Sequence, residues 1–236
     1  MYKKVAAIYD IHGNDSALEA VIKEILAQEV DLIVVGGDVA WGPEPAAVLK
    51  RLHQLDCEVR FVRGNADREV GERYGVEQGL DVLTAEINQW CTDQLSNEEQ
   101  KFLANLPEWQ KIEIEGLGTV LFVHGSPRSD EEAISVNTPE EELKPMFEGI
   151  EPFVIVCGHT HIQFDRKACG KRIVNPGSVG LPFGTQAACW ALFSNKVELK
   201  KTFYDINQAV KQIECSGMPH AGEFAVHILN PPSKGP

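Results

Sequence analysis

The sequence predicts an α/β fold in which parallel strands alternate with helices over the first 65 residues. Short apolar runs recur there, separated by amphipathic or proline-started segments, as expected for strands joined by right-handed crossovers. The strand runs are apolar at consecutive positions, which indicates burial on both faces of a sheet. Polar residues follow these runs abruptly, and the carboxyl ends of strands are where α/β proteins place their ligands.

The strand–helix pattern is clearest at the amino end of the chain. Val5–Tyr9 predicts a buried strand, and Ser16 starts an amphipathic helix whose apolar residues recur at helical spacing. Asp31–Val35 and Glu58–Val62 predict two more strands, with a helix over Glu44–Leu55 between them. These segments form two strand–helix units followed by a third strand.

The rest of the chain mixes helices with hairpins. Residues 68–108 predict helices, one of them capped by Thr84, and Thr138 predicts the cap of a short helix near residue 140. Two closing helices are predicted over Ile206–Cys215 and Ala221–Leu229. The predicted strands of this part are Gln110–Glu115, Thr119–Val123, Phe153–Cys157, Gln163–Ala168, Lys171–Val174, Ala188–Phe193 and Val197–Phe203.

Length and composition bound the organisation and the partners. We expect one domain over residues 1–229 and a disordered, proline- and glycine-rich tail over residues 230–236. With 22 basic and 35 acidic residues the net charge is −13, which argues against general nucleic-acid or anionic-membrane binding. No apolar run approaches the ~20 residues that cross a bilayer.

The six cysteines carry no metal-binding or redox spacing. No two of them form a CxxC pair, and the amino end does not resemble a signal peptide. We therefore expect reduced, mostly buried thiols in a cytoplasmic protein. A homo-oligomer is compatible with the sequence.

Five predicted strand ends carry side chains that can bind metals. They are Asp10 and His12, Asp38, Asn65, His124, and His159 and His161. Each is alone an ordinary turn or loop residue, but five such ends exceed what chance placement explains. Strand ends of one sheet lie side by side, so these side chains can converge on one pocket. We expect Asp10 and His12 to face the same side of an extended backbone.

The number of donors predicts two cations. Two carboxylates, four imidazoles and one amide oxygen serve two ions if one carboxylate bridges them. This mixture suits Mn, Fe, Co, Ni or Zn better than Mg. A tetrahedral structural zinc site is the competing hypothesis, but it usually includes cysteine, and none is placed for it. Two cations ~3.5–4 Å apart are a device for hydrolysing phosphate esters.

One known family has the same motifs in the same order: Asp10-x-His12, Gly37-Asp38, Gly64-Asn65, His124 and Gly158-His159-x-His161. The chain resembles the calcineurin-like metallophosphoesterase superfamily, and Asn175-Pro176-Gly177-Ser178 resembles its small prokaryotic phosphodiesterase branch. The resemblance implies a four-layer α/β/β/α sandwich of two mixed sheets flanked by helices. It also implies two metal positions that share Asp38, with Asp10, His12 and His161 at one and Asn65, His124 and His159 at the other.

Several positions depart from the family pattern or stand outside it. Ala66 stands where many members carry a histidine that acts as general acid, and Val39-Ala40-Trp41-Gly42 follows the bridging aspartate where many carry Asp-Arg. Asp67 and Arg68 are candidate substitutes, although a helix-capping aspartate and a surface arginine are equally expected. We expect Trp41 to pack under the following helix rather than stack on a base. His53, His220 and His227 are expected at the surface.

The resemblance implies a metal-dependent phosphoesterase that hydrolyses phosphate esters, above all phosphodiesters, by attack of a metal-bridging hydroxide. Manganese is the first choice of metal, and the residues expected in catalysis are Asp38, Asn65, His124 and His159. The expected substrate is a small phosphoester or nucleotide-like molecule. The alternatives are a protein phosphatase, a dinucleoside polyphosphate hydrolase, or a metal-binding protein-interaction scaffold. The scaffold is disfavoured because no ligand position is lost.

Overall fold

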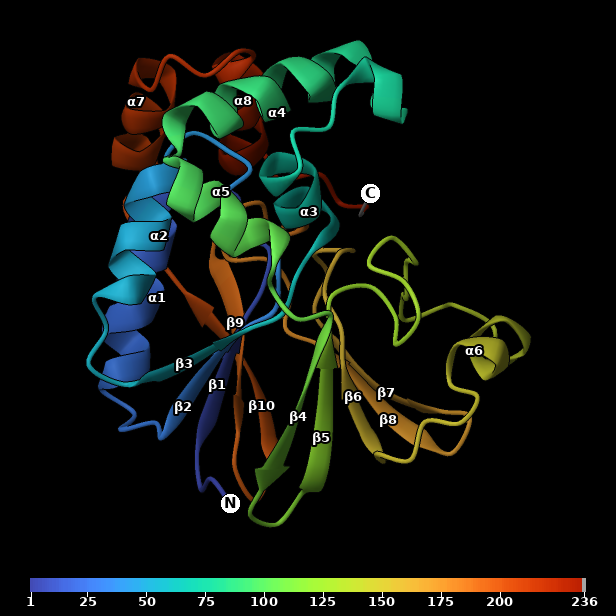
Figure 1. Cartoon of the computed structure of the whole chain (residues 1–236). Coiled ribbons are helices and arrows are strands. Elements are labelled where there is room, and N and C mark those ends of the chain that lie inside the picture. Colours follow the sequence, from blue (N-terminus) through green and yellow to red (C-terminus); the bar gives the residue numbers. More distant parts are fainter. Residues whose placement is uncertain (235–236) are drawn as a thin grey trace.

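The computed structural model describes residues 1–234 and contains two five-stranded sheets packed face to face (Figure 1). The first sheet has the order β10 (Val197–Thr202), β9 (Ala188–Phe193), β1 (Val5–Ile8), β2 (Leu32–Val35) and β3 (Glu58–Phe61). The second has the order β4 (Trp109–Ile114), β5 (Gly118–Val123), β6 (Val154–Val156), β8 (Lys171–Asn175) and β7 (Phe164–Ala168).

Both sheets are mixed. In the first, β1, β2 and β3 run parallel, whereas β9 and β10 are antiparallel additions beside β1. In the second, β5, β6 and β8 run parallel, and β4 and β7 pair antiparallel at the two edges. The carboxyl ends of the central parallel strands of both sheets therefore point toward one end of the sandwich.

Helices cover the two outer faces unequally (Figure 1). The helices that share a hydrophobic cluster with the outer face of the first sheet are α1 (Asp15–Leu26), α2 (Pro45–His53), α3 (Asn65–Gly71), α4 (Val82–Gln94), α5 (Asn97–Ala104), α7 (Ile206–Cys215) and α8 (Ala221–Leu229). The second sheet packs against α6 (Glu140–Met146) alone among these helices. This arrangement confirms the predicted four-layer α/β/β/α sandwich.

The hydrophobic core has three parts that follow these layers. Alternate residues of β1 point in opposite directions, as in any strand: Ala6 and Ile8 join the helices, whereas Ala7 joins the layer between the sheets. Phe122 and Phe193 fill that inner layer with rings 5.6 Å apart. The third cluster lies between the second sheet and α6.

Three predicted helix starts are wrong by a few residues. The cap of α1 is Asn14, whose side chain accepts the N–H of Ala17, so the helix begins before Ser16. The cap of α4 is Asp81, which accepts the N–H of Thr84 at 3.1 Å. Thr138 does not cap α6, because its hydroxyl accepts the N–H of Ser135 instead. In α1 and α4 a nearby side-chain acceptor takes the role, whereas α6 begins after Pro139 with no side-chain cap.

The expectations on membrane spans, cysteine burial and tail disorder have different outcomes. None of the helices in residues 1–234 is long and apolar enough to cross a membrane. All six cysteines are free thiols, but only Cys91, Cys157 and Cys189 are buried, so the expectation of mostly buried thiols holds for half of them. The predicted disorder of residues 230–236 stays a prediction, and residues 235–236 lie outside the described residues.

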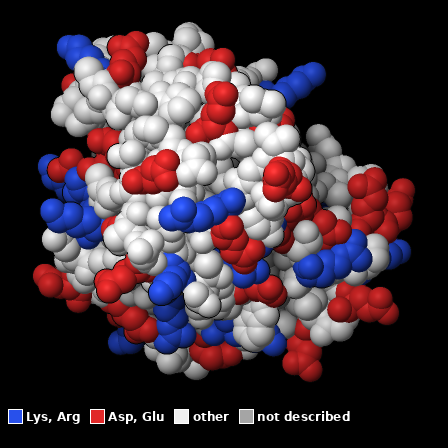
Figure 2. All heavy atoms as spheres, turned by 45° about the horizontal axis from the view of Figure 1, so that its top comes forward, with Lys and Arg blue, Asp and Glu red and all other residues white. Residues whose placement is uncertain are grey.

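Charged side chains are interspersed on the surface. Figure 2 is turned so that the top of Figure 1 comes forward, and it shows acidic and basic residues mixed over this face. The described residues of this face form no continuous basic area. This distribution agrees with the net charge of −13. General nucleic-acid binding relies on such basic areas.

Candidate dinuclear metal site

Strands of both sheets bring the predicted site residues together. Asp10 and Asp38 follow β1 and β2 of the first sheet, and His124 and His159 follow β5 and β6 of the second. The ligand atoms form two groups, within each of which they lie within 4.8 Å of one another. We call Asp10, His12 and His161 the first half-site, and Asp38, His124 and His159 the second half-site.

The backbone turns sharply at these positions and is not extended. Five predicted ligands have positive φ: Asp10 (54°), His12 (48°), Asp38 (53°), His159 (65°) and His161 (57°). The expected extended backbone at Asp10 and His12 is therefore wrong, although their two side chains do lie together in the first half-site. The left-handed conformation is unfavourable for residues with a Cβ, at about 1–3 kcal/mol each, and such strain clusters at functional sites.

Hydrogen bonds between neighbouring loops hold this strained backbone. The N–H of Asp10 donates to the carbonyl of Gly37 at 3.1 Å, and the N–H of His12 donates to the carbonyl of Asp38 at 2.9 Å. Gly64 passes so close that an added Cβ would lie 2.1 Å from Asp38 Oδ1. Only glycine permits that approach.

Asp38 of the second half-site also approaches the first. Its Oδ2 is 3.7 Å from Nε2 of His12, and its Oδ1 is 3.5 Å from Nε2 of His124. The N–H of Ala66 donates to Oδ1 at 2.9 Å. Burial favours the neutral carboxyl, but the imidazoles of His124 and His12 outweigh it and hold the pKa of Asp38 below its usual range. This is the position that a bridging carboxylate requires.

Backbone carbonyls fix the orientation of three imidazoles. Each Nδ1 lies at hydrogen-bond distance from a carbonyl oxygen: His12 from Trp41 at 3.2 Å, His124 from Gly36 at 2.9 Å and His161 from Leu181 at 2.9 Å. Because a carbonyl only accepts, Nδ1 carries the hydrogen, and Nε2 is the ring atom that would bind a metal. Metal-binding histidines are commonly oriented in this way.

Buried polar atoms without partners indicate what the site holds. Asp10 Oδ1, Asn65 Oδ1 and His124 Nε2 are buried without a hydrogen bond to any described residue. A buried polar group left unpaired costs about 1–3 kcal/mol, so such atoms call for an explanation. Asn65 donates Nδ2–H to Glu69 at 3.3 Å, which leaves its oxygen as the available atom. Carboxylate, amide and imidazole atoms of this kind fit divalent transition metals.

The two half-sites differ in proton affinity. Burial lowers the pKa of His12 to about 4 and lowers the pKa of His161 well below its usual value. Burial also disfavours the charged form of His124, but the carboxylates of Asp38 and Asp10 outweigh it and raise its pKa to about 10. His159 is partly exposed, and burial lowers its pKa.

Asp67 supports the backbone around Asp38. The sequence did not distinguish this role from that of a helix cap. It is fully buried, and its carboxylate accepts the N–H groups of Asp38 at 2.8 Å, Val39 at 2.9 Å and Gly64 at 3.0 Å. Burial raises its pKa to about 6. With its oxygens engaged by the backbone and no access to solvent, Asp67 is excluded as a substitute for the general acid missing at Ala66.

Arg68 is not an ordinary surface arginine. Its Nε donates to Asp130 at 2.8 Å, its Nη2 donates to Glu131 at 2.7 Å, and 17% of its side chain is exposed. The guanidinium also lies over the ring of Tyr74. Neither carboxylate partner is close to Arg68 in sequence, so this network could not be predicted from local patterns.

The other singled-out residues have mixed outcomes. Trp41 packs against the core under the helices, as predicted, and its ring lies 5.6 Å from that of His12. His53 and His220 are exposed, as predicted. The surface prediction for His227 is wrong, because its half-buried ring lies 3.0 Å from the carbonyl of Pro182. Helix α8 packs back against the loop after β8, and no local signal announces that contact.

Comparison with known proteins identifies the family. The model of the calcineurin-like phosphoesterase superfamily domain matches residues 4–198. The chain belongs to this superfamily. It is 30% identical to an uncharacterized protein of Methanocaldococcus jannaschii, over 91% of this chain and 93% of the relative. It is 27% identical to phosphodiesterase YfcE of Escherichia coli, over 80% of this chain and 85% of that protein.

A solved structure shows the same fold. The crystal structure of a metallophosphoesterase from Sphaerobacter thermophilus superimposes with a TM-score of 0.77 and 26% identity, over 97% of this chain and 99% of that one. The predicted membership of the calcineurin-like superfamily, in its small prokaryotic phosphodiesterase branch, is thereby confirmed.

Proposed function

We propose that this calcineurin-like phosphoesterase hydrolyses phosphodiesters with two divalent transition-metal ions, manganese being the first choice. The observation that carries the proposal is the pair of half-sites with Asp38 between them, together with the unpaired buried atoms that face this space. Asp10, His12 and His161 would hold one ion, and Asn65, His124 and His159 the other. A scaffold would have no use for such a complete set of buried charges and imidazoles.

When bound, the ions would generate a bridging hydroxide as nucleophile at neutral pH and neutralise charge on the phosphate. The chain's own residues would then orient the ester. Asn65 and His159 are the site residues that are only partly buried, so they can face both a ligand and solvent. Asp38 would keep its charge throughout, because its neighbours hold its pKa low.

Ala66 limits the leaving groups that this site serves well. Its methyl group cannot donate a proton, and buried Asp67 cannot replace the missing donor. An alkoxide is a poor leaving group without protonation, whereas an aryl oxide or a phosphate leaves unaided. The preferred substrates are therefore small esters with a leaving group of low pKa, including nucleotide-like ones.

The experiment is metal analysis joined to an ester panel. The protein is purified without chelator, its metals are measured, and bis(p-nitrophenyl) phosphate and alkyl monoesters are assayed with Mn²⁺ added. We expect two ions per chain and faster hydrolysis of the activated diester. One tightly held zinc, with no second metal after reconstitution and no hydrolysis, would overturn the proposal.

A further inference from the structure

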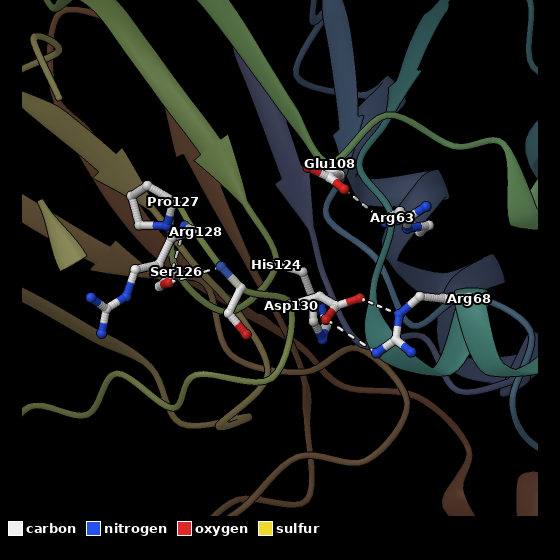
Figure 3. A pocket seen from close by; sticks show the side chains of 9 residues that line it. Arg63, Arg68, Glu108, His124, Ser126, Pro127, Arg128 and Asp130 are labelled. Atoms are coloured by element: carbon white, nitrogen blue, oxygen red, sulfur yellow. Dashed lines mark hydrogen bonds and ion pairs between the residues drawn. The ribbon is translucent and has the colours of Figure 1, made fainter. Parts of the chain in front are cut away.

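A cavity of about 180 Å³ opens beside His124, at the second half-site (Figure 3). The start of α3, the segment before β4 and the loop after β5 surround it. Its charged lining residues are Arg63, Arg68, Arg128, Glu108 and Asp130. Three of the chain's eight arginines thus meet at one cavity, in a chain whose net charge is −13.

Two of the three arginines are neutralised within the wall. Arg68 donates to both oxygens of Asp130, at 2.8 and 3.2 Å. About a fifth of each of these two side chains is exposed. Arg128 donates from Nε to both oxygens of Glu132 at 2.9 Å. Carboxylates bound in this way occupy the guanidinium groups, so Arg68 and Arg128 shape the cavity rather than offer a free cation.

Arg63 is held differently. Its Nη2 donates to Glu108 at 3.0 Å, but 74% of that glutamate side chain is exposed, and exposed ion pairs contribute little. Its Nη1 donates to the carbonyl of Ala104 at a long 3.5 Å. Its Nε is buried without a hydrogen bond to any described residue, and 18% of the side chain is exposed. Arg63 is therefore a mostly buried cation with an unused donor and a weak, displaceable partner.

We propose that the cavity is a second anion subsite, in which Arg63 binds a phosphate group that the substrate carries in addition to the scissile ester. The inference rests on the proposed phosphodiesterase function and narrows its substrates to esters that bear a second phosphate. A guanidinium matches two phosphate oxygens in a fork geometry. Asp130 does not oppose this, because both its oxygens accept from Arg68, and Glu108 can turn into solvent.

The test compares two ligand pairs that differ only in a second phosphate. Binding of thymidine 3′,5′-bisphosphate and thymidine 5′-monophosphate to the manganese-loaded protein is measured by calorimetry. Hydrolysis is measured for the p-nitrophenyl ester of thymidine 5′-phosphate with and without a 3′-phosphate. We expect the second phosphate to tighten binding and lower KM by about ten- to hundredfold, as a charge-assisted hydrogen bond provides.

Variants assign the effect to Arg63. Arg63→Gln should remove most of the preference for the second phosphate, whereas Arg172→Gln, which removes the same charge from an exposed pair with Asp165, should keep it. Glu108→Gln removes the competing carboxylate and should strengthen the preference, which provides a second test should Arg63→Gln fold poorly.

Each outcome decides one of the two proposals. Equal affinity of the wild type for both nucleotides, or a preference that survives Arg63→Gln in a folded protein, would overturn the subsite. Absence of hydrolysis of both esters, with the binding preference intact, would overturn the phosphodiesterase proposal and leave the anion subsite standing.

Discussion

The two half-sites use the same kinds of residue but hold them differently. His12 and His161 are oriented by backbone carbonyls, and burial lowers their pKa, so they are neutral and ready for a cation at pH 7. In the second half-site, His124 is also oriented by a carbonyl, that of Gly36, but neighbouring carboxylates raise its pKa to about 10. His159 is partly exposed, with no ring hydrogen bond to a described residue. The first half-site is therefore the more enclosed of the two, whereas the second reaches solvent through His159.

Replacing the Asp38 carboxylate should have the largest effect, because we propose that both half-sites depend on its charge. Asp38→Asn takes away the charge that we propose both ions share, and we expect kcat/KM to fall by about 10³-fold with loss of at least one ion. The fold should persist, since the change is nearly isosteric. Activity and bound metal are measured together, with Asp165→Asn as control. Wild-type turnover with both ions present would show that Asp38 does not bridge.

Removing one imidazole from each half-site compares how strongly the two half-sites bind their ions. We expect His161→Asn to weaken binding of its ion by about 100-fold and His159→Asn by about tenfold, the range over which supported ligands matter. The reason is that water can replace the partly exposed ring of His159, whereas His161 is buried. Metal titrations of both variants measure the two affinities. Equal losses would mean that burial does not distinguish the half-sites.

Supplying the missing acid tests the chemistry beside the second half-site. Ala66→His should raise the rate on alkyl monoesters by up to ~10², the lower end of what a general acid contributes. Activated diesters should change little, since their leaving group needs no proton. Rates on both ester types are compared in wild type and variant. A wild type that cleaves both equally would mean that another group already supplies the proton.

Proton release on metal binding gives the smallest expected effect. In the metal-free protein His124 is protonated below its pKa of about 10, whereas His12 is neutral above about pH 4. An imidazole must lose its proton to bind a metal, so affinity should rise with pH between 6 and 9. With Mn²⁺ filling both positions at pH 7, calorimetry in two buffers counts the protons released. His124→Asn should release about one fewer and His12→Asn the same number, and identical release from all three proteins would contradict this.

The sequence predicted the side chains that lie together at the candidate metal site because their signal is local. Each lies within a few residues of the end of a strand, as Asp38 follows Leu32–Val35, and that order is visible without tertiary information. Helix α7 over Ile206–Cys215 was predicted to the residue, since its apolar positions repeat at helical spacing. The closed sandwich itself followed from the family resemblance rather than from periodicity.

What the sequence could not predict depends on contacts between distant segments. Asp67 looked like a helix cap, but its three backbone donors include Asp38 and Val39, which lie 28 or more positions earlier. Arg63 meets Glu108 across 45 positions, and His227 meets Pro182 across the same separation. Such partners are fixed by how strands and helices pack, and no spacing rule within one segment reveals them.

The left-handed backbone at the five predicted ligands lowers the stability of the fold, while the side chains at these positions carry the proposed activity. Each of these residues adopts a conformation that glycine enters freely, so His159→Gly or His161→Gly should make the metal-free protein more stable while removing its chemistry. A chain selected for stability alone would drift toward glycine at these turns. A D-aspartate introduced at position 10 by chemical synthesis would adopt the same positive φ without strain. Its carboxylate, however, would point in a different direction.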